Sequence, residues 1–335
     1  MLDFTDYPTL HHALVWSRKT LEMMESGFMT LVDRAPDVMC IAASGSLGRL
    51  EGMEHSDCDL IILVKHEIIS KPERCNESMQ AVWEITEHLG LPGPKSSGIY
   101  STPASYEQIC DYKTLGYIED DKNIFGKRLQ LLLDARPVYG QEFFRHARFD
   151  LLKRYATGFL EYDQCKEWVY LLNDLLRYFR SYCGYHQFDL SSDSVDSWYM
   201  RNVKLRNSRI PMFAALLFLL GECSKEKKDK ISWLNSRLDM TMLERLQYVY
   251  DKNMDDNFEI FLDAYEYFMK KLNNDEIRCK LVNATPGSLA ELNHTSLPEY
   301  KDLHENSKKI ISELTRFTLE RRGQWSDAFF EYLLF

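Results

Sequence analysis

Two short runs decide the fold of this chain: Gly45-Ser46-Leu47-Gly48-Arg49-Leu50-Glu51 and, shortly after it, Ser56-Asp57-Cys58-Asp59-Leu60. The apolar residues 38–43 precede the first run, and such a segment is typical of a buried strand that enters a turn at Gly-rich positions. Residues 60–64 are all apolar and predict a second buried strand. The sequence therefore predicts a strand, a Gly-Ser turn, and a strand that begins with two carboxylates.

The paired aspartates carry the chemistry of the second run. If the chain is extended there, Asp57 and Asp59 project from the same face, because side chains alternate along a strand. Two such charges repel each other, and one carboxyl group tends to stay protonated unless a cation compensates. Oxygen ligands of this kind suit Mg²⁺ or Mn²⁺, which commonly bridge carboxylates to the phosphates of a substrate.

The Gly-Ser turn is suited to phosphate. Gly45 allows a ligand to approach the backbone closely, and Ser46 can donate a hydrogen bond to a phosphate oxygen. The two runs thus predict a phosphate site beside a metal site. The alternative interpretation is a hairpin-like surface turn with two solvated aspartates.

The combined pattern resembles the nucleotidyltransferase superfamily that shares the DNA polymerase beta palm. Gly-Ser-Leu-Gly-Arg-x-Glu followed by Ser-Asp-x-Asp-Leu is most similar to the bacterial branch that contains protein uridylyltransferases and their uncharacterised relatives. The resemblance implies metal-dependent transfer of a nucleoside monophosphate from a nucleoside triphosphate to a hydroxyl on a protein or small molecule, with release of pyrophosphate. It assigns Asp57 and Asp59 to the catalytic metal and Gly45, Ser46 and Arg49 to the nucleotide.

Enzymes of this superfamily normally add a third carboxylate from a neighbouring strand. The corresponding segment here, residues 96–101, contains no acid. Three alternatives stay open: Asp111 or Glu107 completes the site, the site works with two carboxylates, or the chain is a catalytically degenerate nucleotide-binding regulatory protein. An interaction scaffold without a nucleotide site is a further class.

Composition limits the function classes. The chain has 335 residues, of which 45% are hydrophobic and 27% charged, which fits a cytoplasmic enzyme with a core divided over two domains. The net charge of −10 argues against an extended nucleic-acid surface. The eight cysteines form no Cys-x-x-Cys pair, so they indicate neither a zinc site nor a disulfide scaffold. The amino terminus lacks the pattern of a secretory signal. The longest apolar run, residues 213–220, is too short to cross a bilayer. It therefore predicts a buried helix, and no membrane partner is expected.

The predicted fold class is α+β. We expect a small nucleotidyltransferase palm, a mixed sheet with flanking helices, in residues 1–118, with an N-terminal helix over about Thr9–Leu31. Pro72 predicts the start of a helix that continues to His88, and a third strand is expected near Gly98–Thr102. From Asn123 onward apolar residues recur at helical spacing, which predicts that residues 119–335 form a larger all-α domain that closes over the nucleotide site.

Two helical segments in the second half are unusually basic for an acidic chain. Asn173, Arg177 and Arg180 share one face of a regular helix, and so do Asn202, Arg206 and Arg209. Lys and forked Arg donors are what a polyphosphate requires. We assign five basic residues to nucleotide binding: Arg177, Arg180, Lys204, Arg206 and Arg209. The alternative is a solvated helix face paired with acidic neighbours.

Overall fold

In the computed structural model the chain divides into two compact units, each assembled from segments that are distant in sequence. Unit 1 comprises Met1–His11, Leu175–Lys225 and Met242–Phe335, and unit 2 comprises His12–Asp174 and Glu226–Thr241. The structure describes residues 2, 4–94, 96–118, 120–163, 165–188, 197–226, 228–284, 286 and 297–335. The domain boundary expected after residue 118 falls inside unit 2.

Unit 2 is mixed α and β. Its elements, in chain order, are α1 (Pro8–Phe28, which begins in unit 1), α2 (Leu31–Arg34), β1 (Val38–Ser44), α3 (Gly45–Gly48), β2 (Asp59–Val64), α4 (His66–Ile69), α5 (Pro72–His88), β3 (Ala104–Ser105), α6 (Tyr106–Cys110), α7 (Lys122–Leu133), β4 (Arg136–Tyr139), α8 (Gln141–Ala156) and α12 (Lys230–Asn235).

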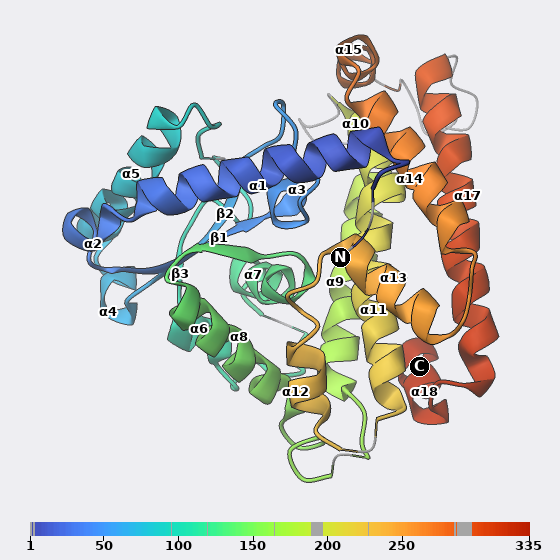
Figure 1. The fold of residues 1–335 in the computed structure, drawn as a ribbon. Helices are drawn as coiled ribbons and strands as arrows, with labels where there is room; N and C mark the ends of the chain where they lie inside the picture. Colours follow the sequence, from blue (N-terminus) through green and yellow to red (C-terminus); the bar gives the residue numbers. More distant parts are fainter. Residues whose placement is uncertain are drawn as a thin grey trace. The chain divides into compact units, whose positions relative to one another are not determined.

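The four strands form one mixed sheet in the order β3-β2-β1-β4 (Figure 1). β1 is antiparallel to both β2 and β4, whereas β2 is parallel to β3. β4 lies beyond residue 118, so the expectation of an exclusively helical second half is wrong at this point. The sequence signal was weak because β4 is a short edge strand that contains Pro137, which has no N–H to donate to a ladder.

The third strand also differs from its predicted position. Residues 98–102 form bends and turns, and β3 follows at Ala104–Ser105. Two residues explain the shift. Gly98 has a left-handed backbone with φ of +89°, which does not fit a strand, and Pro103 cannot donate to a neighbouring strand.

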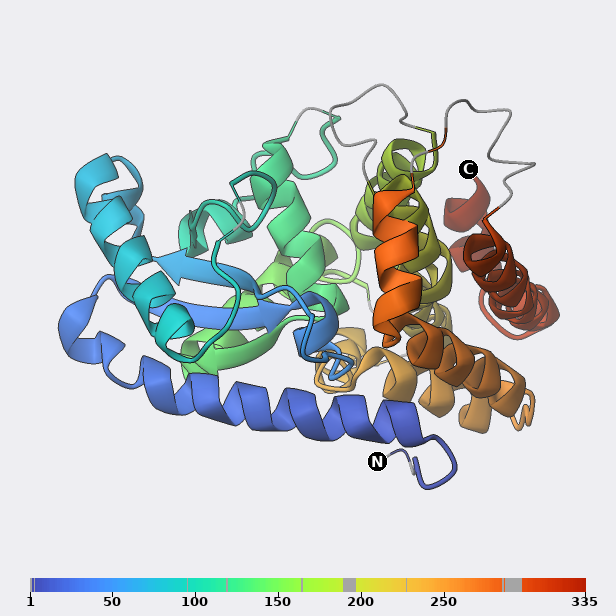
Figure 2. The same ribbon diagram turned by 90° about the horizontal axis from the view of Figure 1, so that it is seen from above.

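One face of the sheet is covered by two long helices (Figure 2). Met24 and Phe28 of α1 and Val82 of α5 join alternate residues of the central strands, such as Ile41 and Ile62, in one buried cluster. The residues between them, such as Ala42 and Ile61, are also buried, so both faces of the central strands are covered. The core fixes β1 and β2 against each other. The candidate site lies where the chain leaves β1 and enters β2, at the ends of these two central strands.

Unit 1 contains only helices among its described residues. They are α9 (Val169–Phe188, which begins in unit 2), α10 (Trp198–Lys204), η1 (Leu205–Arg209), α11 (Ile210–Ser224), α13 (Met242–Lys252), α14 (Phe258–Leu272), α15 (Asp275–Asn283), α17 (Pro298–Glu320), η2 (Arg321–Gly323) and α18 (Asp327–Leu334). The apolar run 213–220 lies within α11, where most side chains are buried, as the sequence predicts. Among the described helices, none is both long and apolar enough to span a membrane.

The segment η1 is a π-helical turn between α10 and α11. Its central residue, Asn207, is buried and donates a hydrogen bond from Nδ2 to the carbonyl of Val203 over 3.0 Å. Asn306 of α17 in turn donates to Asn207 Oδ1 over 3.1 Å and to the Ala264 carbonyl over 2.8 Å. A buried polar network therefore holds the π turn against α14 and α17.

Candidate functional site

The antiparallel register of β1 and β2 brings the two sequence runs together. Ser44, the last residue of β1, is paired with Asp59, the first residue of β2. The chain leaves β1 through Gly45, whose φ of +66° lies in the left-handed region. A Cβ atom at Gly45 would lie 3.0 Å from Asp59 Oδ2, so the backbone of the turn packs directly against this carboxylate. Glycine is required here for both its conformation and its lack of a side chain.

The two aspartates differ in environment. Asp59 is half-buried at the start of β2, whereas Asp57 is exposed and precedes the strand. The intervening Cys58 is buried. Only Asp59 therefore lies on the strand itself, at the end where it is paired with Ser44 and the Gly-Ser turn begins.

A third carboxylate reaches the turn, and the sequence analysis did not assign it. Asp134 follows α7 directly and is 6% exposed. Its Oδ1 accepts a hydrogen bond from the Ser44 hydroxyl over 2.7 Å, and its Oδ2 accepts from the Gly45 N–H over 3.1 Å. Arg49 Nη1 also donates to Oδ2 over 2.7 Å. Asp134 therefore binds the end of β1 and the start of α3 to one another.

The environment of Asp134 is electrostatically costly. Burial raises its pKa above the ordinary value, the Arg49 guanidinium and the Ser44 hydroxyl oppose that rise, and the negative charge of Asp59 adds to it. Asp134 and Asp59 thus repel each other at the turn. A divalent cation at Asp59 would reduce that repulsion.

Arg49 is bonded to two carboxylates at the turn. It is nearly buried, and its Nε donates to Glu51 Oε2 over 2.8 Å while Nη1 contacts Asp134. A guanidinium held between two buried carboxylates already has its charge compensated. Arg49 therefore helps to hold the turn, and the role in nucleotide binding predicted for it stays a prediction.

Ser46 is the residue of the turn that remains available to a ligand. It is half-buried, and its hydroxyl makes no hydrogen bond to any residue that the structure describes. Its backbone carbonyl accepts from the Glu51 N–H over 2.8 Å, which closes the turn behind it. Ser46 can therefore donate to a phosphate oxygen without breaking a bond of the fold.

The segment expected to carry the third acid supplies a phenol instead. The Tyr100 hydroxyl lies 2.9 Å from Ser44 Oγ, so residues 96–101 do approach the turn. The two acids considered as replacements are engaged elsewhere: the exposed Glu107 lies 3.8 Å from His66 Nδ1, and Asp111 accepts from the Lys113 N–H over 2.9 Å. Within the described residues, neither is bonded to the turn.

The chemistry of the two aspartates is the kind that suits a hard divalent cation. Asp57 and Asp59 offer carboxylate oxygens, and the backbone of Gly45 leaves space beside Asp59 that a side chain would fill. Within the described residues, no group of three or more His, Cys, Asp or Glu side chains is arranged to hold a metal. The magnesium site expected from the sequence stays a prediction.

The five basic residues assigned to nucleotide binding all belong to unit 1. Arg180 is exposed, while Arg177, Lys204, Arg206 and Arg209 are half-buried. Arg206 Nε donates to Ser307 Oγ over 2.8 Å, and burial lowers its pKa. The Arg209 guanidinium lies over the Tyr182 ring, 5.0 Å from its centroid. Because η1 is π-helical, the shared face predicted from regular helical spacing does not continue through Arg206 and Arg209.

Comparison with known proteins adds no assignment. No protein-family model matches this sequence, and no curated protein matches it.

Proposed function

We propose that this protein is a metal-dependent nucleotidyltransferase that moves a nucleoside monophosphate from a nucleoside triphosphate to a hydroxyl acceptor and releases pyrophosphate. The observation that carries the proposal is the packing of the Gly45 backbone against the Asp59 carboxylate, 3.0 Å from a Cβ position. A phosphate that approaches the turn at Gly45, which has no side chain, would lie next to a carboxylate that can bind a metal.

The residues of the turn have separate roles in this proposal. Asp57 and Asp59 would hold Mg²⁺ or Mn²⁺, and the Ser46 hydroxyl would donate to a phosphate oxygen. Asp134 and Arg49 fix the Gly45 backbone, so the donors need no rearrangement when the substrate binds. When bound, the metal supplies neutralisation of the negative charge on the phosphates.

Positioning of the acceptor is the remaining requirement. An acceptor oxygen that attacks the α-phosphorus displaces pyrophosphate, and catalysis of this kind depends mainly on alignment and charge stabilisation. The acceptor is a protein or a small molecule, because the net charge of −10 disfavours an extended nucleic acid.

The test replaces both metal-binding carboxylates. We expect Asp57→Asn with Asp59→Asn to lower pyrophosphate release by at least about a thousandfold, because the metal loses both protein ligands. The assay supplies the four nucleoside triphosphates, Mg²⁺ or Mn²⁺ and a mixture of acceptors, and mass spectrometry identifies the labelled product. Glu54→Gln, an exposed acid in the same loop, is the matched control and should keep the parent rate.

A double variant that retains the parent rate, with an unchanged circular dichroism spectrum, would contradict the assignment. Removing the Asp59 charge also removes its repulsion of Asp134.

A specific observation favours a second candidate, a nucleotide-binding regulatory protein without turnover. The segment that should supply the third acid contributes Tyr100 instead, and the oxygens of Asp134 already accept three hydrogen bonds. This candidate predicts a thermal shift with a nucleoside triphosphate but no release of pyrophosphate. An interaction scaffold without a nucleotide site predicts neither effect.

A further inference from the structure

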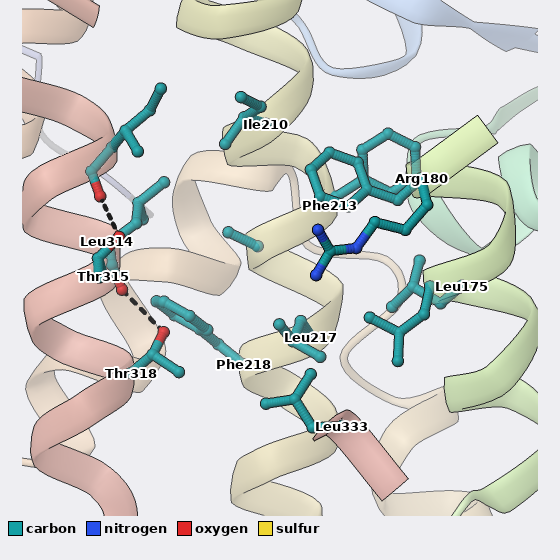
Figure 3. A pocket seen from close by; sticks show the side chains of 14 residues that line it. Leu175, Arg180, Ile210, Phe213, Leu217, Phe218, Leu314, Thr315, Thr318 and Leu333 are labelled. Atoms are coloured by element: carbon teal, nitrogen blue, oxygen red, sulfur yellow. Dashed lines mark hydrogen bonds between the residues drawn. The ribbon is translucent and has the colours of Figure 1, made fainter. Parts of the chain in front are cut away.

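Unit 1 contains a cavity of about 190 Å³ that is distinct from the turn in unit 2 (Figure 3). Helices α9, α11 and α17 form its walls, and Leu333 of α18 contributes at one end. The lining is mostly apolar and includes the aromatic rings of Phe179, Phe213 and Phe218. Such a lining favours an apolar group of matching size.

Arg180 is the only charged residue among the described residues that line the cavity. Its side chain extends from α9 and directs the guanidinium over the cavity (Figure 3). In the described part of the chain it makes no hydrogen bond or ion pair. Arg180 and Thr315 are the two exposed lining residues, so the cavity opens to solvent beside the guanidinium.

The two threonines of the lining are not available as donors. Thr315 Oγ1 donates to the Ile311 carbonyl over 2.7 Å, and Thr318 Oγ1 donates to the Leu314 carbonyl over 2.8 Å. Both bonds lie within α17 and are drawn in Figure 3. The cavity therefore presents one polar feature to a ligand, a cationic planar fork at its opening.

We propose that this cavity binds a small arylalkyl monocarboxylate, with the ring inside and the carboxylate on Arg180. Apolar cavities of about 150 Å³ hold one benzene-sized molecule, so about 190 Å³ accommodates a phenyl ring and a short linker but no long acyl chain. The guanidinium matches a planar carboxylate through two parallel hydrogen bonds. A single arginine compensates one negative charge, which favours a monocarboxylate over a phosphate dianion.

The test uses the full chain and three probes that differ only in the head group: 3-phenylpropanoate, 3-phenylpropan-1-ol and 3-phenylpropylamine. Isothermal titration calorimetry measures the three affinities. We expect the carboxylate to bind at least about tenfold more tightly than the alcohol, because a hydrogen bond to a charged group contributes enough binding free energy for that ratio. The amine should bind most weakly. Arg180→Met should remove the preference and leave the affinity for the alcohol within about twofold.

Two further variants complete the design. Ala214→Phe places a ring in the cavity and should abolish binding of all three probes. Lys309→Met removes an exposed charge from α17 outside the lining and should change nothing. Three results would each overturn the proposal. The parent binds the carboxylate and the alcohol equally well, the Arg180→Met variant still prefers the carboxylate, or the parent binds no probe at millimolar concentration. Arg180 is exposed, so its variant tests the proposal even if Ala214→Phe does not fold.

Discussion

The two ends of β1 both contact a buried aspartate, but the two aspartates are compensated in opposite ways. At the beginning of the strand, Asp37 accepts from Arg74 over 2.5 Å and lies 3.3 Å from Lys65 Nζ. The side chains of these two cations are 46% and 42% exposed. At the other end, Asp134 is paired with the nearly buried Arg49, and a second carboxylate, Asp59, lies close enough to repel it.

The pKa directions express this difference. Burial tends to raise the pKa of Asp37, but its hydrogen bonds with Arg74 and Lys65 outweigh burial, and the pKa is lowered. For Asp134 burial prevails, and the pKa is raised. The charges at the first end stabilise the fold, whereas the negative charges that gather at the second end repel each other and destabilise it. Such unfavourable local arrangements in a stable fold are expected at functional sites.

The largest effect is expected from a substitution of Asp134, at the end of β1 where negative charges gather. Asp134→Ala takes one of the two carboxylates away from the buried Arg49 and removes the acceptor of the Gly45 N–H. We therefore expect the free energy of unfolding to fall by about 3–5 kcal/mol. Urea denaturation measures it. Adding Arg49→Met should not restore the loss, because Arg49 keeps its ion pair with the buried Glu51 and its removal would take that cation away. A loss no greater than that of Asp37→Asn would show that the two ends do not differ.

The second effect concerns Lys127, on the helix that delivers Asp134 to the turn. Lys127 is fully buried, its Nζ makes no hydrogen bond within the described residues, and burial lowers its pKa to about 8. A lowered lysine pKa means that the unfolded chain binds more protons between pH 8 and the ordinary value of 10.5, so stability rises with pH in that window.

Lys127→Met should therefore stabilise the protein at pH 7, by at most about 3 kcal/mol, and remove that rise. Urea denaturation at pH 7 and pH 10 measures both effects. Lys122→Met, an exposed lysine of the same helix, is the control and should leave the pH dependence as in the parent. A destabilised Lys127→Met variant would show that the ammonium group has a partner that compensates its burial.

The smallest effect is expected from a substitution of Asp37, at the beginning of β1. Asp37→Asn should lower the free energy of unfolding by about 1 kcal/mol at pH 7, because both cationic partners are half-exposed. A lowered carboxyl pKa contributes stability above the unfolded value and loses it as the pH falls through the folded value. The difference from the parent should therefore vanish in acid. Asp33→Asn, at an exposed position nearby, should show no difference at either pH if the pair with Arg74 is the cause.

The strands and helices with strong local signals could be predicted from the sequence. The apolar runs before Gly45 and after Asp59 form β1 and β2, and α5 spans Pro72–His88 as predicted from Pro72. The N-terminal helix is shorter than expected, ending at Phe28. These elements depend on neighbouring residues alone, which is why pattern and capping were sufficient.

The candidate site was predictable only where it is local. Gly45 and Asp59 meet because a single strand pairing fixes their register. Asp134 was not assigned because its contacts with Ser44, Gly45 and Arg49 span about 85–90 residues of sequence. For the same reason the sequence alone does not predict the ion pair between Arg49 and Asp134, which forms only when the chain is folded.

The π turn at Leu205–Arg209 has a consequence for how this chain can change by mutation. A π turn accommodates one more residue than a regular turn without breaking the helix. Deleting one residue there would leave an ordinary helical turn, and the segments on either side would keep nearly the same faces, because the π turn had absorbed the extra residue. Asn202, which accepts a hydrogen bond from Tyr300 over 3.0 Å, would then keep that neighbour. A single-residue deletion in this segment should therefore be better tolerated than one in the regular helix α11, where it would rotate the preceding residues by about 100°.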